Sequence, residues 1–154
     1  MDFCRVFELT FHKSISLNSN GDIVAIGAPR NDANGSDSGH VRVYQNVGGT
    51  WTKIGRDIDG ANDFLGWSVS LNSGGDIVAI GAWQGQAANG SYSGHVRVYQ
   101  IIGRIWTQIG SDIDGEAAND FFGWSVSLNS AGDMVAIGAN ANDTNGADSG
   151  HFKV

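Results

Sequence analysis

The chain is poor in several residue classes, and each shortage excludes a kind of protein. Its 154 residues contain one cysteine, Cys4, so no disulfide can form within the chain, and no Cys/His cluster of the zinc-binding kind is present. No run approaches the ~20 apolar residues of a membrane span, and charged residues interrupt the first residues where a signal peptide would need an apolar core. Basic residues are few as well: 9 Lys and Arg against 16 Asp and Glu give a net charge of −7, which disfavours nucleic-acid binding.

Proline and helical patterning are also scarce, whereas glycine is abundant. The chain has one proline and 23 glycines. No segment shows convincing apolar periodicity of 3.6 residues, so essentially no helix is expected. Because aromatic residues make up 10% of the chain, the composition is not that of a disordered protein. These features predict an all-β fold of short strands joined by many turns.

The sequence repeats itself three times. The segment VAIGA recurs at 24–28, 78–82 and 135–139, and the octet GWSVSLNS stands unchanged at 66–73 and 123–130. The repeat length is 55 to 56 residues, measured from Gly39 to Gly94 and from Gly94 to Gly150. We therefore divide the single repeat region 1–154 into unit 1 (14–63), unit 2 (64–120) and unit 3 (121–154), preceded by a divergent N-terminal strand in 1–13.

Each unit is predicted to form four strands, at 66–72, 76–82, 95–100 and 106–110 in unit 2. In the first two strands, large and small side chains fall on opposite faces. The large face carries Trp67, Val69, Leu71, Val78 and Ile80, and the small face carries Ser68, Ser70, Ala79 and Gly81. A sheet with one bulky and one shallow face suits stacking on copies of itself, as blades of four antiparallel strands do in a β-propeller.

Two segments resemble a known family. They are DFLGWSVS at 63–70 and DFFGWSVS at 120–127, and a VAIGA segment follows each; the first copy reads Gly27-Ala28-Pro29. These motifs are similar to the FG-GAP repeat of integrin α-subunit β-propellers. The resemblance implies a propeller of seven blades in the usual member, an extracellular or cell-surface location, and a role in adhesion or ligand binding.

Two features depart from the family pattern. Integrin-type repeats often carry a D-x-D-x-D-G-x-x-D calcium loop between the first two strands, but the turns here, at 18–22, 72–76 and 129–133, are too short and too poor in carboxylates. The family's calcium site is therefore not carried over. The second departure is the count: 154 residues at about 55 per unit give about 2.8 blades, whereas closed propellers have ~4–8.

The low blade count leaves three explanations open. The chain is a piece of a longer propeller, or copies of it self-associate through open blade faces, or the alternating segment 5–11 supplies a strand to another blade. A β-trefoil, which also has three four-stranded units in such a length, is the alternative fold.

The loop between the second and third strands of each unit offers two kinds of candidate site. Oxygen ligands around Asn-Gly turns in units 1 and 3 could wrap a calcium ion, although such residues also form turns without metal. The candidate ligands are Asp32, Asn34, Asp37, Asp143, Asn145 and Asp148. In unit 2 the same loop carries Trp83 and Tyr92, which are candidate anchors for a protein or a sugar, or caps on a groove between blades.

The remaining polar residues recur once per unit, as framework residues do. His40, His95 and His151 each open a third strand without a nucleophile or acid at a suggestive spacing, so we interpret them as structural. The D-I-D-G segments at 57–60 and 112–115 place two carboxylates at i and i+2, a spacing that would also suit general acid/base work or a hard-cation site. We interpret them as Asp-Gly turns whose carboxylates accept backbone N–H groups between blades.

The sequence therefore predicts a non-enzymatic adhesion or protein-interaction module. A lectin-like propeller is the alternative, with a fragment of a propeller hydrolase behind both, because a hydrolase needs one asymmetric cluster of catalytic groups. No cofactor is expected beyond the candidate calcium ion. The expected partners are a protein or glycan ligand and not a nucleic acid.

Overall fold

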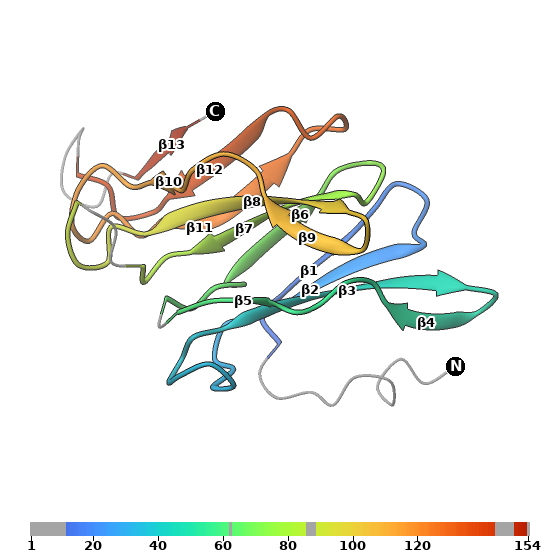
Figure 1. The fold of residues 1–154 in the computed structure, drawn as a ribbon. Helices are drawn as coiled ribbons and strands as arrows, with labels where there is room; N and C mark the ends of the chain where they lie inside the picture. The colour runs from blue at the N-terminus through green and yellow to red at the C-terminus, as the bar shows by residue number, and fades with distance from the viewer. Residues whose placement is uncertain (1–11, 62, 86–88, 144–149, 154) are drawn as a thin grey trace.

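The computed structural model describes residues 12–61, 63–85, 89–143 and 150–153, and within them every regular element is a β-strand (Figure 1). These residues contain no helix. They therefore contain no helix that is long and apolar enough to cross a membrane. The strands are β1 (Ser14–Leu17), β2 (Ile23–Ala28), β3 (His40–Val47), β4 (Thr50–Lys53), β5 (Ile58–Asp59), β6 (Ser68–Leu71), β7 (Ile77–Ala82), β8 (His95–Ile102), β9 (Ile105–Gln108), β10 (Ile113–Asp114), β11 (Phe122–Leu128), β12 (Val135–Ala139) and β13 (His151–Lys153).

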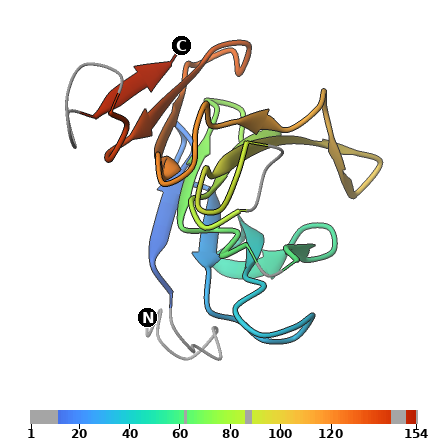
Figure 2. The same ribbon diagram turned by 90° about the vertical axis from the view of Figure 1, so that its left-hand side faces the viewer.

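The strands form three antiparallel sheets, one for each unit of the sequence. Unit 1 has the order β1-β2-β3-β4, unit 2 repeats it with β6-β7-β8 and β9 paired to β8, and unit 3 contributes β11-β12-β13. The register is the same in the first two units, with Ser14 opposite Gly27 and Ser68 opposite Gly81. The sheets are separate and lie side by side (Figures 1 and 2), as propeller blades do. The all-β, blade-like prediction is confirmed, and the trefoil alternative finds no support.

The core lies between the sheets, where the large face of one unit packs on the small face of the unit before it. Between units 1 and 2, Val69, Leu71 and Ile80 of unit 2 share one buried cluster with Ala25 and Val43 of unit 1. A second cluster joins units 2 and 3. The segment IVAIGA has the same burial pattern in β2 and β7, with its last five residues buried. The predicted division into a bulky face and a shallow face is confirmed.

Serine hydroxyl groups fasten each unit to the next. We call β1, β6 and β11, the first strand of each unit, the inner strands. The first serine of an inner strand donates a hydrogen bond to a carbonyl of the next unit, and the second serine accepts one from an N–H group of that unit. The pairs are Ser14 Oγ to Gly66 O (2.8 Å), Ser68 Oγ to Gly123 O (2.8 Å), Leu71 N to Ser16 Oγ (2.9 Å) and Leu128 N to Ser70 Oγ (2.9 Å). Both junctions between units are therefore built from the same contacts.

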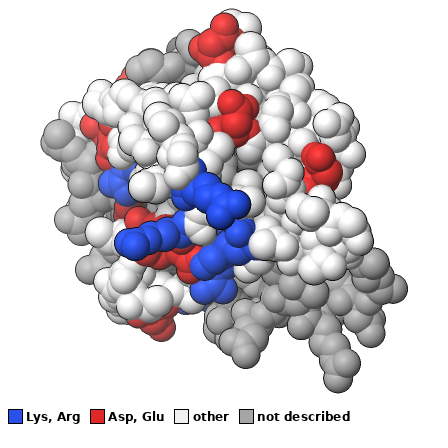
Figure 3. Space-filling view, turned by 45° about the vertical axis from the view of Figure 1, so that its right-hand side comes forward, with Lys and Arg blue, Asp and Glu red and all other residues white. Residues whose placement is uncertain are grey.

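The prediction for the D-I-D-G segments was wrong. Ile58–Asp59 is the short strand β5, whose residues pair with the start of β3, and β10 pairs with β8 in the same way. The Asp57 carboxylate pairs with side chains of its own unit, Arg42 Nε at 2.8 Å and Lys53 Nζ at 2.6 Å. Figure 3 shows Lys and Arg side chains gathered around Asp on one face of the molecule. The charged residues and not the Asp-Gly pair determine this local structure.

Candidate functional site

Six aromatic side chains from units 2 and 3 form a cluster at one edge of the sheets, which we call the rim. Trp83 lies at the centre of this cluster. Trp83 follows the last residue of β7 directly. Its ring centroid lies 5.3 Å from that of Trp67, 5.0 Å from Phe121 and 5.7 Å from Trp124, all in edge-on geometry. It also stacks on Tyr92 with centroids 6.2 Å apart. Phe64, at 6.0 Å, completes this aromatic cluster.

The members of the aromatic cluster divide into buried and exposed groups. Trp83 is half-buried, and its Nε1 atom is buried without a hydrogen-bond partner, so its polar edge does not face solvent. Tyr92 and Trp124 are 42% and 38% exposed. Trp83 therefore supports the cluster from within, while Tyr92 and Trp124 offer ring surface to a ligand.

Hydrogen bonds between units hold three members of the aromatic cluster in a strained backbone conformation. Phe64, Tyr92 and Phe121 have φ angles of 57°, 57° and 55°, a left-handed conformation that bulky residues rarely adopt. Two hydrogen bonds impose it: Phe64 N donates to Asp37 O at 3.1 Å, and Phe121 N donates to Tyr92 O at 3.1 Å. Each bond joins the loop of one unit to the start of the next, so the rings are fixed before any ligand arrives.

Of this cluster, the sequence predicted only Trp83 and Tyr92 as binding residues. The other four members are Phe64, Trp67, Phe121 and Trp124 of the repeated D-F-x-G-W segments, which the sequence connected only with the family resemblance and the large face of a blade. The signal that could have identified them is the position of that segment: it opens the inner strand at the same rim where the loop after β7 begins.

A cationic side chain continues the series of inner-strand aromatics into unit 1. Lys13 directly precedes β1, as Trp67 precedes β6, and its Nζ atom lies 4.2 Å from the centroid of the Trp67 ring. This distance is typical of a cation–π interaction. Beside it lies an open cavity of about 300 Å³ lined by His12, Lys13, Pro29, Arg30 and Trp67. The rim is therefore aromatic over units 2 and 3 and positively charged at unit 1.

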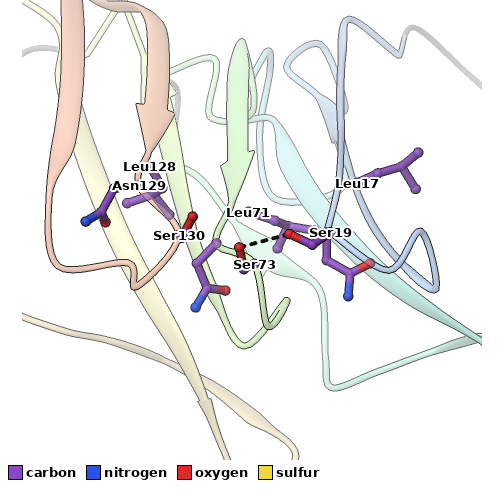
Figure 4. Close-up of a pocket in the computed structure, with 9 residues that line it drawn as sticks. Leu17, Ser19, Leu71, Ser73, Leu128, Asn129 and Ser130 are labelled. Atoms are coloured by element: carbon purple, nitrogen blue, oxygen red, sulfur yellow. Dashed lines mark hydrogen bonds between the residues drawn. The ribbon is translucent and has the colours of Figure 1, made fainter.

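A polar pocket of about 160 Å³ lies at the other end of the inner strands, where the Leu-Asn-Ser turns of all three units meet (Figure 4). Ser19 and Ser73 face each other across it with their Oγ atoms 2.9 Å apart. The asparagines organise these turns: Asn72 Oδ1 accepts the N–H groups of Gly75, Asp76 and Ile77 at 2.9 to 3.1 Å. Each unit carries one such asparagine, but its role in closing the turn was not predicted from the sequence.

The candidate calcium ligands are only partly brought together. In unit 1, Asp32 Oδ1 accepts the N–H group of Asp37 at 2.7 Å, so this carboxylate closes its own turn, and Asn34 is exposed in the same loop. Asp143 is exposed, whereas Asn145 and Asp148 lie outside the described residues. Calcium binding by these loops stays a prediction.

Two other groups of ligand atoms lie within 4.8 Å of one another, and both belong to charge networks. They are His40 with Asp57 and Asp59, and His95 with Asp112 and Asp114. In the first, both Asp57 oxygens already contact Arg42 and Lys53. A cation would have to displace those partners.

The second network joins unit 1 to unit 2 and centres on the buried carboxylate of Asp63, the last residue of unit 1. Its Oδ2 atom lies 3.3 Å from His95 Nε2 and 3.1 Å from Arg97 NH1, and Arg97 Nε pairs with Asp112 at 2.9 Å. Burial alone would raise the pKa of Asp63, but the hydrogen bond and charge of His95 and the charge of Arg97 outweigh it, so the pKa is lowered. Burial and the charge of Arg42 lower the pKa of His40, which favours its neutral form. The histidines that open β3 and β8 are buried, as expected of structural residues, whereas His151 is exposed.

The comparisons with known proteins agree with the repeated architecture. Residues 111–152, which run from just before β10 to β13, match the family model of the FG-GAP repeat. No curated protein matches the chain. Outside the matched residues, units 1 and 2 carry the same VAIGA segment, and unit 2 carries the same GWSVSLNS octet as unit 3.

Proposed function

We propose that this chain of FG-GAP repeats is a non-enzymatic adhesion or protein-interaction module of an extracellular or cell-surface protein, and that it binds its ligand with the aromatic cluster. FG-GAP repeats typically form interaction modules, which supports the class of function. The observation that carries the proposal is the rim itself: Tyr92 and Trp124 are large, partly exposed rings. Exposed rings on a rigid scaffold are typical anchors of protein interfaces.

The polar groups support a non-enzymatic role. The Asp63 carboxylate contacts both His95 and Arg97, and the histidine and the aspartate are buried with 4% exposure each. Charged groups that are paired with one another beneath the surface are not accessible to a substrate. The aromatic cluster, in contrast, offers surface without a nucleophile or an acid among its members.

A lectin-like function is the second candidate, and the same cluster favours it. Sugars present apolar faces that stack on flat aromatic rings, and Tyr92 is such a ring, supported from behind by Trp83. The two candidates predict different ligands for one surface, so a single experiment distinguishes them.

The test measures binding of the chain to immobilised matrix glycoproteins (fibronectin, laminin and collagen), each before and after enzymatic removal of its glycans. We expect Tyr92→Ala and Trp124→Ala to weaken binding at least roughly tenfold. Ile105→Ala truncates an exposed apolar side chain at the start of β9, with 61% exposure against 42% for Tyr92 and 38% for Trp124. It is the control and should bind as the unaltered chain does.

Each outcome decides between the candidates. Binding that persists on the deglycosylated proteins and depends on the two rings supports the protein-interaction module. Binding that disappears with the glycans supports the lectin-like function instead. Failure to bind every member of the panel, or equal loss in the Ile105→Ala control, contradicts the role assigned to the rim.

A further inference from the structure

The small face of unit 3, which we call its outer face, carries the same groups that join unit 1 to unit 2 and unit 2 to unit 3. Ser125 and Ser127 occupy the positions of Ser14 and Ser16 in unit 1, and both are exposed. In units 1 and 2 the equivalent hydroxyl groups bond to the next unit. The described residues place no further unit over this face, which therefore presents the same hydrogen-bonding groups to solvent.

The apolar groups of this face follow the same pattern. Met134 is 57% exposed, whereas the residues at its position, Ile23 and Ile77, pack against a glycine turn of the following unit. Gly138 is the equivalent of Gly27. A Cβ atom at Gly27 would lie 2.1 Å from the carbonyl oxygen of Gly66 in unit 2, but at Gly138 it would meet only atoms of Ser125 in its own unit.

Unit 1 presents the complementary surface along β1. Ile15 and Leu17 are 63% and 56% exposed, although the residues at the same positions in unit 2, Val69 and Leu71, are only 8% and 7% exposed. The difference arises because unit 1 covers Val69 and Leu71. The turn after β1 is open as well, since Gly21 has no atom within 4 Å of its Cβ position.

We propose that the outer face of unit 3 docks on the β1 face of unit 1 in a second copy of this chain, so that copies associate head to tail. The internal junctions assign the contacts: Ser127 Oγ accepts the N–H group of Leu17 of the partner subunit, and Met134 packs on Gly21 of the partner subunit. We assign the outer face of unit 3 to a second copy because the β1 face presents apolar residues and a turn glycine. Their equivalents in units 2 and 3 pack on the small face of the preceding unit at both internal junctions.

The number of sheets in two copies is compatible with a closed ring. A head-to-tail contact joins two different surfaces, so it generates a ring when the rotation between copies closes. Two copies bring together six sheets, three from each chain, and closed propellers contain ~4–8 blades. The proposal concerns the assembly and is independent of what the aromatic cluster binds.

The experiment measures the mass of the full chain in solution by sedimentation velocity and light scattering over a wide range of concentrations. We expect a species of twice 16.2 kDa. Met134→Lys places a charge on the outer face of unit 3 and should leave the 16.2 kDa monomer. Ile105→Lys is the matched control, because Ile105 is 61% exposed against 57% for Met134 but lies on β9 away from either face, and it should still dimerise.

Two further variants make the direction of the contact measurable. Leu17→Lys should also give monomers, and mixing it with Met134→Lys should restore a dimer, because each variant keeps the surface that the other has lost. Gly138→Ala, which removes only the space for a docked carbonyl, should weaken association roughly tenfold or more. Circular dichroism verifies that each variant is folded.

Several results would overturn the proposal. A monomer at every concentration excludes the second copy as occupant. A Leu17→Lys chain that still dimerises indicates contact between two unit 3 faces instead. Masses that grow beyond two chains with concentration indicate an open filament and exclude the ring of six units.

Discussion

Three equivalent glycines allow the junction between units to be tested with one kind of substitution. Gly27, Gly81 and Gly138 occupy the same position of the VAIGA segment, and none of them has a positive φ. A Cβ atom at Gly27 or Gly81 would lie 2.1 Å from a carbonyl oxygen of the next unit, whereas Gly138 faces no further unit within the described residues. We therefore compare Gly27→Ala, Gly81→Ala and Gly138→Ala.

Opposing free-energy terms determine the expected magnitudes. Alanine stabilises a strand by roughly 0.5–1 kcal/mol relative to glycine, because it has less backbone entropy to lose on folding. At Gly81 the new methyl group must push the neighbouring carbonyl away, and overpacking of this kind costs about 1–3 kcal/mol. It also strains the bond from Ser68 Oγ to Gly123 O, which contributes about 1 kcal/mol. At Gly138 only the exposed Ser125 hydroxyl has to rotate.

We expect Gly81→Ala and Gly27→Ala to be less stable than Gly138→Ala by about 2–4 kcal/mol. The assay is urea unfolding monitored by tryptophan fluorescence, at a concentration low enough to keep the chain monomeric, and the midpoint is compared at constant slope. Equal shifts in the three variants would refute the reasoning, because they would show that the strand and not the neighbouring carbonyl responds to the methyl group.

Two further predictions concern single side chains. Asp63→Asn should destabilise the chain at pH 7. The pKa of Asp63 in the folded chain is below its ordinary value of 3.8, so the carboxylate stabilises the fold above pH 3.8. This contribution is lost as the pH falls through the folded pKa. In acid titrations followed by circular dichroism, the difference from the unaltered chain should shrink below about pH 4, and a constant difference would contradict the assignment. Asn72→Ala leaves three N–H groups without their acceptor and should cost about 1–3 kcal/mol in urea unfolding. Asn129→Ala in the more exposed turn of unit 3 should cost less, and the reverse order would argue against the burial of Asn72 as the cause.

The strands could be predicted from the sequence because each one is a local pattern. The alternation of Val69 and Leu71 with serines gave β6, and the nearly continuous apolar run of IVAIGA gave β7. The same alternation identified the bulky and shallow faces, because a residue's face in a strand depends only on its position. Three copies of each pattern made these predictions stronger than a single copy would have.

The features that escaped prediction depend on contacts between distant segments. The strand β5 has two residues, too few for a pattern, and its pairing with β3 depends on where the chain returns. The aromatic cluster gathers Trp67, Trp83 and Trp124 from two units, and their proximity follows from stacking of the sheets. The partners of Asp63 lie more than 30 residues away in β8, so spacing along the chain could not reveal the ion pairs.

The unchanged octet in units 2 and 3 has a consequence for how the chain folds. The strand β6 and most of β11 lie in two identical copies of the octet, so β7 can pair with the SVSL segment of either copy through the same side chains and backbone groups. During refolding the correct and the exchanged pairings differ only in the length of chain that must close between them. We infer that the refolding chain forms exchanged hairpins, within one molecule or between two, and that their slow resolution limits the rate at which the native stack of sheets is reached.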